Sequence, residues 1–229
     1  MSFILTEKTE SERTKRQTLN RWVIYTVGML VLAMGLTLNT KTGLGVSPIL
    51  SLAYCSTRIW GVNLGDAPFV LCALFVIAQL ILRGKHRQWY DLLQLPLSLV
   101  FSRVLNVYDR WVTYDPARHG LAANLVCLAL AILVTGVGVS MTVNMRLVPN
   151  PGDGIVQAIA DLMGRDQGFA KNCFDLVCVA LTVILSLVML GRVAAVGLGT
   201  VLAMVGVGRA ISLVNHFFKD KMCRAAGML

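Results

Sequence analysis

Apolar residues form long uninterrupted runs along this chain, and polar residues are concentrated between the runs. A helix rises about 1.5 Å per residue, so a run of about 17 to 25 apolar residues is long enough to cross the hydrocarbon core of a bilayer. The pattern predicts six membrane-crossing helices, at residues 22–38, 67–82, 91–107, 121–143, 169–190 and 193–213.

Two further helical segments, residues 48–60 and 151–163, do not fit this template. Each begins with a proline, after Ser47 and Asn150, and proline after an N-cap residue is a typical helix start. Each segment would be about 20 Å long as a helix, which is too short to cross the bilayer. The second segment also carries acidic residues, so it is not expected to face lipid.

The two short segments belong to an internal repeat. Several residue pairs share an offset of 103 positions, among them Pro48 and Pro151, Gly61 and Gly164, and Gly35 and Gly138. The order of elements also repeats: crossing helix, irregular link, short proline-started helix, glycine-containing turn, two crossing helices. We therefore predict a basic cytoplasmic tail at 1–21, membrane repeats at 22–108 and 121–216, a polar linker at 109–120 and a cytoplasmic tail at 217–229.

Two topologies are compatible with this repeat. If the short helices are re-entrant, each repeat has three crossings and the two repeats are inverted in the membrane. If the short helices span, each repeat has four crossings. Both topologies give the excess of cytoplasmic Lys and Arg that orients membrane proteins, but only the re-entrant one places the basic loop 83–87 inside. The favoured fold is an all-α membrane protein with six transmembrane helices and two re-entrant half-helices.

Composition supports membrane insertion and excludes other classes. Apolar residues make up 56% of the 229 residues and charged residues 14%, with a mean hydropathy of +0.68. A soluble globule of this size would be about 25% charged. The net charge of +9 comes from clusters at the ends of apolar runs, which indicates an anionic membrane surface rather than nucleic acid. The six cysteines are thinly spread and lie mostly in apolar stretches, which does not indicate a disulfide scaffold.

In the re-entrant topology, the N-termini of the two half-helices meet near the bilayer midplane. A helix N-terminus presents unpaired N–H groups and the positive end of the helix dipole, so it favours an anionic or carbonyl oxygen. Broken-helix transporters use this arrangement. Ser47, Pro48, Asn150 and Pro151 are therefore candidate substrate-binding residues; alternatively, they only cap buried helix ends.

Charged residues within the apolar runs are further candidates for this site, because charges in hydrocarbon are costly. Asp153 either complements the helix dipole or binds a cation or proton at the centre. Asp175 either pairs with Lys171 four residues earlier or titrates in a cavity. Arg103 and Arg209 either extend to the interface or pair with an aspartate or a substrate anion.

Other polar residues point to structural roles. Asp66 is expected to cap the helix that follows it, and Gln79 and Gln94 either line a cavity or hydrogen bond between helices. The three histidines and the cysteines lack metal-ligand spacing, and the chain contains no nucleotide-binding or hydrolase motif. We expect no metal, no cofactor and no enzymatic activity.

Two stretches in corresponding positions, GLTLNTKTGLGVSPILSL and NMRLVPNPGDGIVQAIADLMGR, resemble the paired motifs of bacterial YczE/YitT-type membrane proteins. The V-G-L-G-T sequence at 196–200 fits the same pattern, and the resemblance covers residues 22–216. It implies a multi-pass protein of the bacterial cytoplasmic membrane and says little about activity.

The duplicated half-helices and the buried carboxylates favour a small-solute permease with a binding site near the midplane. The alternative is a non-transporting assembly or regulatory partner of another membrane system, docked through glycine-rich faces. The expected contacts are the lipid bilayer and a small solute; a homo-oligomer is compatible with the sequence and nucleic acid is not. Both termini are expected in the cytoplasm.

Overall fold

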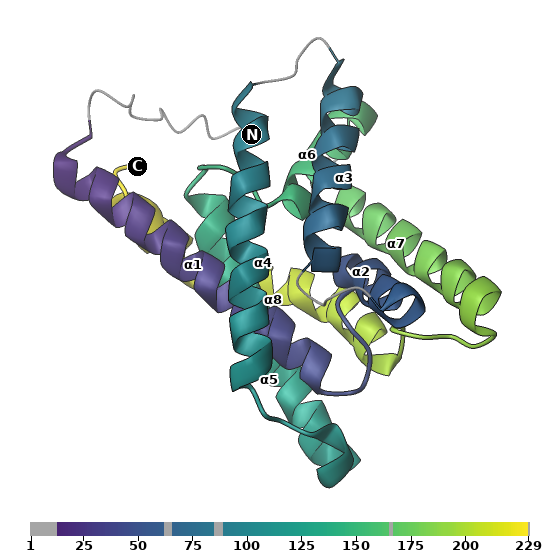
Figure 1. Ribbon diagram of the computed structural model, residues 1–229. Helices are drawn as coiled ribbons and strands as arrows, with labels where there is room; N and C mark the ends of the chain where they lie inside the picture. The colour runs from purple at the N-terminus through teal and green to yellow at the C-terminus, as the bar shows by residue number, and fades with distance from the viewer. Residues whose placement is uncertain (1–12, 62–65, 85–88, 165–166, 229) are drawn as a thin grey trace.

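The computed structural model describes residues 13–61, 66–84, 89–164 and 167–228. These residues form eight α-helices and two short 3-10 helices, with no β-strand among them (Figure 1). The α-helices are α1 (Lys15–Lys41), α2 (Pro48–Trp60), α3 (Asp66–Arg83), α4 (Gln94–Trp111), α5 (Leu121–Asn144), α6 (Pro151–Met163), α7 (Gln167–Leu190) and α8 (Leu198–Ala225). The 3-10 helices are η3 (Trp89–Leu93) and η4 (Pro116–Arg118).

The two short helices, α2 and α6, have the bounds predicted from their sequences. Each begins with a proline and ends at a glycine in the left-handed conformation, with φ of 65° at Gly61 and 60° at Gly164. A side chain at such a position would clash with the backbone, so glycine is favoured there. The glycine N–H groups donate to carbonyl groups of the last helical turn and end both helices.

Five helices in the described chain, α1, α3, α5, α7 and α8, are long and apolar enough to cross a bilayer. The sixth predicted crossing, residues 91–107, differs from the prediction. Its first residues form η3, and α4 begins only at Gln94. α4 buries Gln94, Ser98 and Ser102, and it also carries three charged residues, Arg103, Asp109 and Arg110, so it is not among these five helices. The all-α membrane class is therefore confirmed with five such helices.

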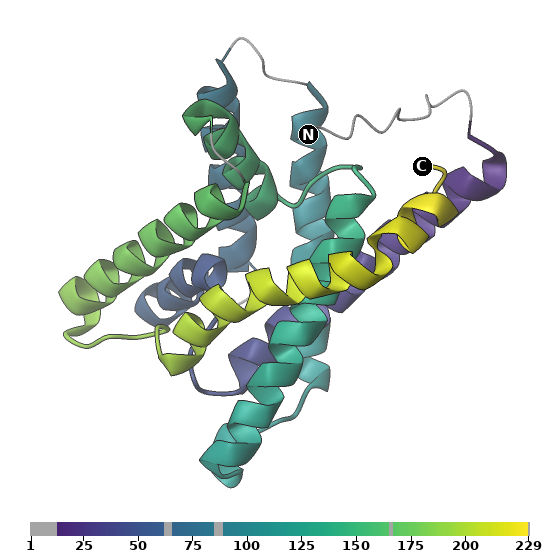
Figure 2. The same ribbon diagram turned by 180° about the vertical axis from the view of Figure 1, so that it is seen from behind.

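Parts of both predicted tails are helical, at residues 15–21 and 217–225. α1 begins at Lys15, because the side chain of Thr14 accepts a hydrogen bond from the Gln17 N–H and caps the helix. α8 begins at Leu198 instead of residue 193 and continues to Ala225. Asn20 on α1 donates to the Ala225 carbonyl oxygen (3.0 Å), so the first turns of α1 and the last turn of α8 lie side by side (Figure 2).

The longest packing contact joins α1 to α5, which run antiparallel. Glycines allow the close approach: Gly28 lies against Met141, Gly35 against Thr135 and Gly138 against Leu32. α8 packs on the neighbouring face of α5, where the Asn144 amide donates to the Asn215 side-chain oxygen (2.7 Å).

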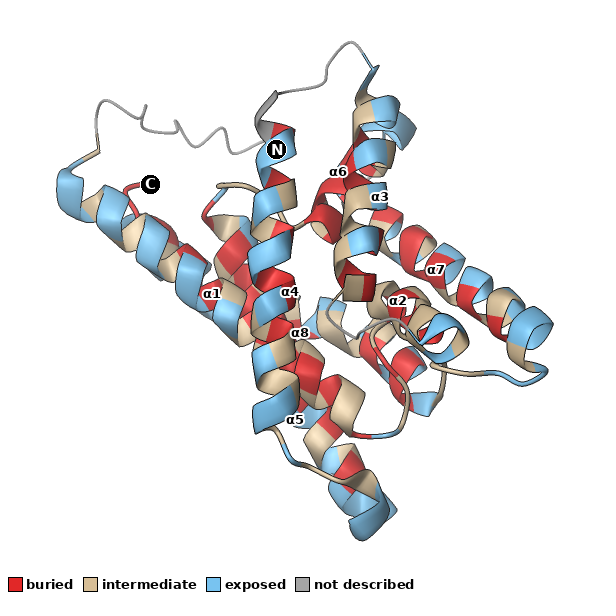
Figure 3. Ribbon diagram, in the orientation of Figure 1, coloured by how far each residue is buried: buried red, intermediate tan, exposed pale blue. Residues whose placement is uncertain are grey.

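Helices of one predicted repeat also pack on helices of the other: α2 packs on α7, and α3 packs on α6. Their shared core includes Leu71, Ile155 and the edge-to-face ring pair of Phe75 and Phe174, whose centroids are 5.2 Å apart. Buried residues gather where helices face each other, and the outward faces of α7 and α8 are exposed (Figure 3). These exposed faces are rich in Leu, Val and Ile, as expected for helices in contact with lipid.

Candidate functional site

The first turns of the two short helices meet inside the protein. A Cβ atom on Gly152 of α6 would lie 3.1 Å from the Ile49 Cδ1 atom of α2, and both leading prolines, Pro48 and Pro151, are buried. α7 packs against both short helices. On the α2 side, the Ser51 and Thr182 hydroxyl groups are 2.8 Å apart, and both residues are fully buried.

Ser47 and Asn150 precede these helices as predicted, but their side chains make no capping hydrogen bond. Their backbone carbonyls accept the first hydrogen bond of each helix, as N-cap carbonyls usually do. The Ser51 N–H donates to the Ser47 carbonyl oxygen (2.8 Å), and the Gly154 N–H donates to the Asn150 carbonyl oxygen (2.8 Å). The helix starts therefore leave the two side chains available for other contacts.

An ion pair on α7 lies close to the first turn of α6. The Lys171 ammonium donates to the Asp175 carboxylate one turn along, which is the pairing predicted from the i,i+4 spacing. The Asp175 side chain is almost fully buried, at 4% exposure. Asp153 of α6 is partly buried and interacts electrostatically with both of these charges. Three ionisable groups from two helices are thus gathered at one turn.

Two glutamines complete the surroundings of this turn. Gln79 of α3 and Gln94 of α4 are both fully buried, and neither side chain has a hydrogen-bond partner within the described residues. A Cβ atom on Gly154 would overlap the Gln79 carboxamide and lie 2.9 Å from the Gln94 side-chain oxygen. The glutamines therefore face the α6 backbone, and the alternative of a direct hydrogen bond between helices is not observed for the described chain. We call Gln79, Gln94, Asp153, Lys171 and Asp175 the α6 polar cluster.

We did not predict a further ion pair, which joins α3 to η3. Arg83, one turn after Gln79 on α3, donates to both oxygens of Asp91 on η3 at 2.8 and 2.7 Å. The Asp91 side chain has no exposed surface. Asp91 also stands three residues before Gln94, so helical spacing places the four residues in one polar column between α3 and α4. The helical spacing of Arg83 from Gln79 and of Asp91 from Gln94 is the sequence signal that could have predicted this column.

The two predicted arginines, Arg103 and Arg209, are both exposed. Arg103 pairs with an aspartate, which was one of the alternatives for it. The Arg103 side chain is 61% exposed and its nearest carboxylate is Asp66, at 3.5 Å. Asp66 is the first residue of α3 rather than a cap before it. Arg209 is also exposed, because the neighbouring Ala210 is the residue that packs against α5, on Gly136.

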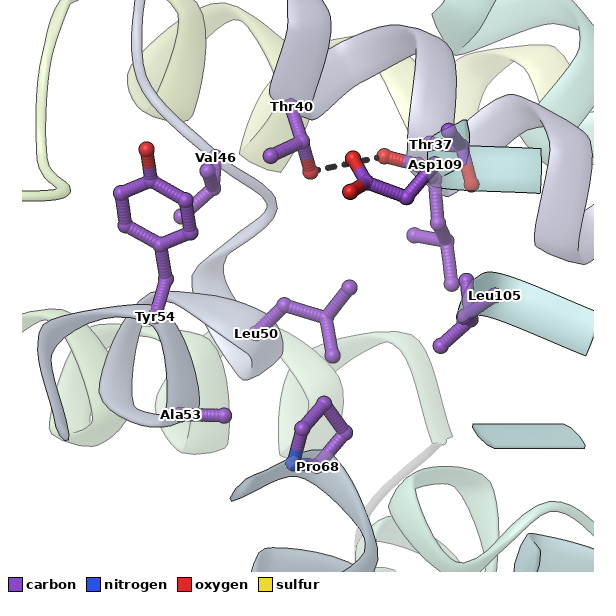
Figure 4. Close-up of a pocket in the computed structure, with 10 residues that line it drawn as sticks. Thr37, Thr40, Val46, Leu50, Ala53, Tyr54, Pro68, Leu105 and Asp109 are labelled. Carbon is purple, nitrogen blue, oxygen red and sulfur yellow. Dashed lines mark hydrogen bonds between the residues drawn. The ribbon is translucent and has the colours of Figure 1, made fainter. Parts of the chain in front are cut away.

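A small cavity of about 30 Å³ lies on the α2 side of the apposed turns, enclosed by α1, α2, α3 and α4 (Figure 4). Thr37, Thr40, Tyr54 and Asp109 contribute its polar groups, and the Asp109 carboxylate is 2.8 Å from the Lys41 ammonium. The cavity has room for about one water molecule. Within the part of the chain that the structure describes, no group of three or more His, Cys, Asp or Glu residues is placed to hold a metal ion.

Comparison with known proteins gives relatives in one bacterium. The chain is 23% identical over 186 residues to "Uncharacterized protein YyaS" of Bacillus subtilis (strain 168), covering 80% of this chain and 86% of the relative. It is 24% identical over 163 residues to "Uncharacterized membrane protein YczE" of the same strain, covering 71% of this chain and 73% of the relative. No solved structure matches the chain.

The relatives agree with the resemblance noted from the two proline-led motifs. The match to YczE confirms that the chain is similar to a membrane protein of that type. One family, described as "Family of unknown function (DUF6198)", matches residues 19–216 and so includes all eight α-helices in whole or in part. This protein therefore belongs to the DUF6198 family.

Proposed function

We propose that this membrane protein is a small-solute transporter whose binding site lies between the first turns of α2 and α6. The observation that carries the proposal is the apposition of Ile49 and Gly152 at these two helix starts. Irregular backbone within a membrane is tolerated where it is buried in protein or lines a polar cavity, and facing half-helix starts bind solutes and ions in several transporter folds. The proposal assigns no chemical reaction to the chain.

The pattern of helix contacts supports two inverted repeats of three crossings each, with α4 as the sixth crossing. α1 contacts α5, the equivalent helix of the other repeat. The contact of α2 with α7 has its counterpart in that of α3 with α6, and the contact of α1 with α4 in that of α5 with α8. If the two repeats are exchanged, the α1–α5 contact maps onto itself and the other contacts map onto their counterparts, as a pseudo-two-fold axis requires.

The proposed topology makes a prediction about sidedness. In a background with the native cysteines replaced by alanine, we expect cysteines at Trp60 and Val193 to react with an impermeant maleimide from outside the cell. A cysteine at Asp220 should react only after the membrane is opened, because both termini are cytoplasmic in this topology. Labelling of Trp60 and Val193 from opposite sides would show that the short helices span.

The chemistry of the α6 polar cluster favours a small zwitterion, or an anion carried with a proton. Pro151 has no N–H, and the Asp153 and Gly154 N–H groups both donate to the Asn150 carbonyl, so the first turn has little capacity to bind an anion by itself. Lys171 supplies a positive charge nearby, and Asp153 supplies a group that can hold an ammonium ion or a proton.

Replacement of Asp153 by asparagine is expected to reduce transport at least about tenfold, the effect of losing an interaction worth about 1.4 kcal/mol. Purified protein in liposomes that contain a pH-sensitive dye would be offered radiolabelled alanine and lactate, with uptake and internal pH recorded together. Asp161→Asn is the matched control, because Asp161 lies on the same helix and is exposed. Equal uptake by both variants would refute the role of Asp153. No uptake by the wild type, together with co-purification of a stoichiometric membrane partner, would favour the non-transporting alternative.

A further inference from the structure

A second pocket, of about 360 Å³, lies apart from the α6 polar cluster, at the end of α2 and the loop between α7 and α8. Its lining consists of two arginines, one tyrosine and small or apolar residues: Tyr54, Arg58, Leu190, Arg192, Val193, Ala194 and Ala195. No acidic residue is among them. The pocket is therefore a space in which positive charge is concentrated.

Arg58 is held in place on one wall of this pocket. Its guanidinium group donates to the Tyr54 hydroxyl (3.0 Å) and lies over the same ring, 5.4 Å from the centroid. A guanidinium that stacks on an aromatic ring gives up less freedom when it binds a ligand, because its plane is already oriented. Within the described residues, the other N–H groups of Arg58 make no hydrogen bond, so they can bind a ligand.

The opposite wall is fixed by the backbone of the loop. The Ala195 carbonyl oxygen accepts a hydrogen bond from the Val46 N–H (3.1 Å), which ties the loop to the link between α1 and α2. Ala195 has a φ of 69°, an unfavourable conformation for a residue with a side chain, so the surrounding contacts must hold the loop in this form. Arg192 is therefore presented to the pocket by an anchored segment.

Neither arginine is paired with a carboxylate in the described chain. Two other arginines do pair with carboxylates: Arg83 pairs with Asp91, and Arg118 pairs with Asp115. Two guanidinium groups that share a pocket repel each other unless an anion lies between them. Guanidinium forks match the oxygens of phosphate groups particularly well.

We infer that this pocket binds a phosphate group between Arg58 and Arg192. Two sources share this chemistry: the headgroup of an anionic phospholipid and a soluble phosphate. Leu190 and exposed Val193 form an apolar edge beside the arginines, as a phospholipid with its acyl chains would require. The inference does not depend on transport, since the pocket lies outside the α6 polar cluster.

The test uses the purified full-length protein in detergent. Retention of phosphatidylglycerol and phosphatidylcholine is compared by native mass spectrometry, and inorganic phosphate is titrated by calorimetry. We expect binding of phosphatidylglycerol, inorganic phosphate or both, weakened about tenfold or more in the variants Arg58→Gln and Arg192→Gln and further in the double variant. The single variants supply the comparison if the double variant does not fold.

Arg118→Gln is the matched control, because Arg118 is 83% exposed and lies outside the pocket; its binding should equal that of the wild type. Binding of phosphatidylglycerol alone would identify a lipid headgroup as the source, and binding of inorganic phosphate alone a soluble phosphate. The inference is overturned if neither probe binds, if phosphatidylcholine is retained as strongly as phosphatidylglycerol with no phosphate binding, or if the double variant binds like the wild type.

Discussion

Replacement of Gly138 by valine is expected to disrupt the crossing of α1 and α5. A Cβ atom at Gly138 would lie 2.6 Å from the Leu32 Cα atom, and backbone cannot turn away as a side chain can. The valine therefore forces the two helices apart along their longest contact. Overpacking of this kind costs about 1–3 kcal/mol and occasionally more. The melting temperature of the purified protein in detergent measures the loss, and we expect a large decrease or no folded protein.

Gly208→Val supplies the control for this substitution. Gly208 lies within α8, and a Cβ atom there would meet no other atom within 4 Å. The two variants thus share the change in side chain and helix propensity, and they differ in whether a neighbouring helix is close. If both variants melt at the same temperature, close packing at Gly138 does not stabilise the protein.

Replacement of Asp91 by asparagine is expected to destabilise the protein by about 3–5 kcal/mol, the usual cost of removing one partner from a buried ion pair. The Asp91 carboxylate is fully buried and accepts two hydrogen bonds from Arg83, whose side chain is only 15% exposed. An asparagine leaves the guanidinium without its counter-charge at the junction of α3 and η3. Resistance to unfolding by sodium dodecyl sulfate would measure the difference.

Two further variants separate the ion pair from general effects of the substitution. Asp115→Asn removes the same charge from the exposed pair with Arg118, and exposed pairs contribute only about 0–1 kcal/mol. The double variant Arg83→Met with Asp91→Leu removes both charges of this pair and should recover much of the stability, because the Arg83 guanidinium is no longer left without its counter-charge. A double variant as unstable as Asp91→Asn would show that the ion pair itself is not the cause.

Local sequence signals predicted the individual helices well. Proline favours the first position of a helix and glycine the position just after its end. The prolines at 48 and 151 and the glycines at 61 and 164 therefore set the bounds of α2 and α6. Hydropathy predicted less about α4, since its buried polar residues carry no signal of burial. Hydropathy also did not predict that α1 begins at Lys15, because a capped helix continues through polar residues as readily as through apolar ones.

The candidate site was only partly predictable. The spacing of Lys171 and Asp175 is local, and the ion pair follows from it. Contacts such as Gln79 against Gly154 join helices far apart in the chain, and periodicity contains no information about which faces meet. Arg103 and Arg209 illustrate the same point: their distance from the helix ends suggests depth in the membrane, but not the direction in which each side chain points.

The exchange of partners between the two proposed repeats has a consequence for biosynthesis. α2 packs on α7, and α3 packs on α6, so the first repeat leaves the ribosome well before its partners have been translated. The early helices must therefore wait in the translocon or in lipid with their future contact faces uncovered. Neither repeat expressed alone can complete these contacts, but the two halves produced together as separate chains have all the surfaces needed to assemble.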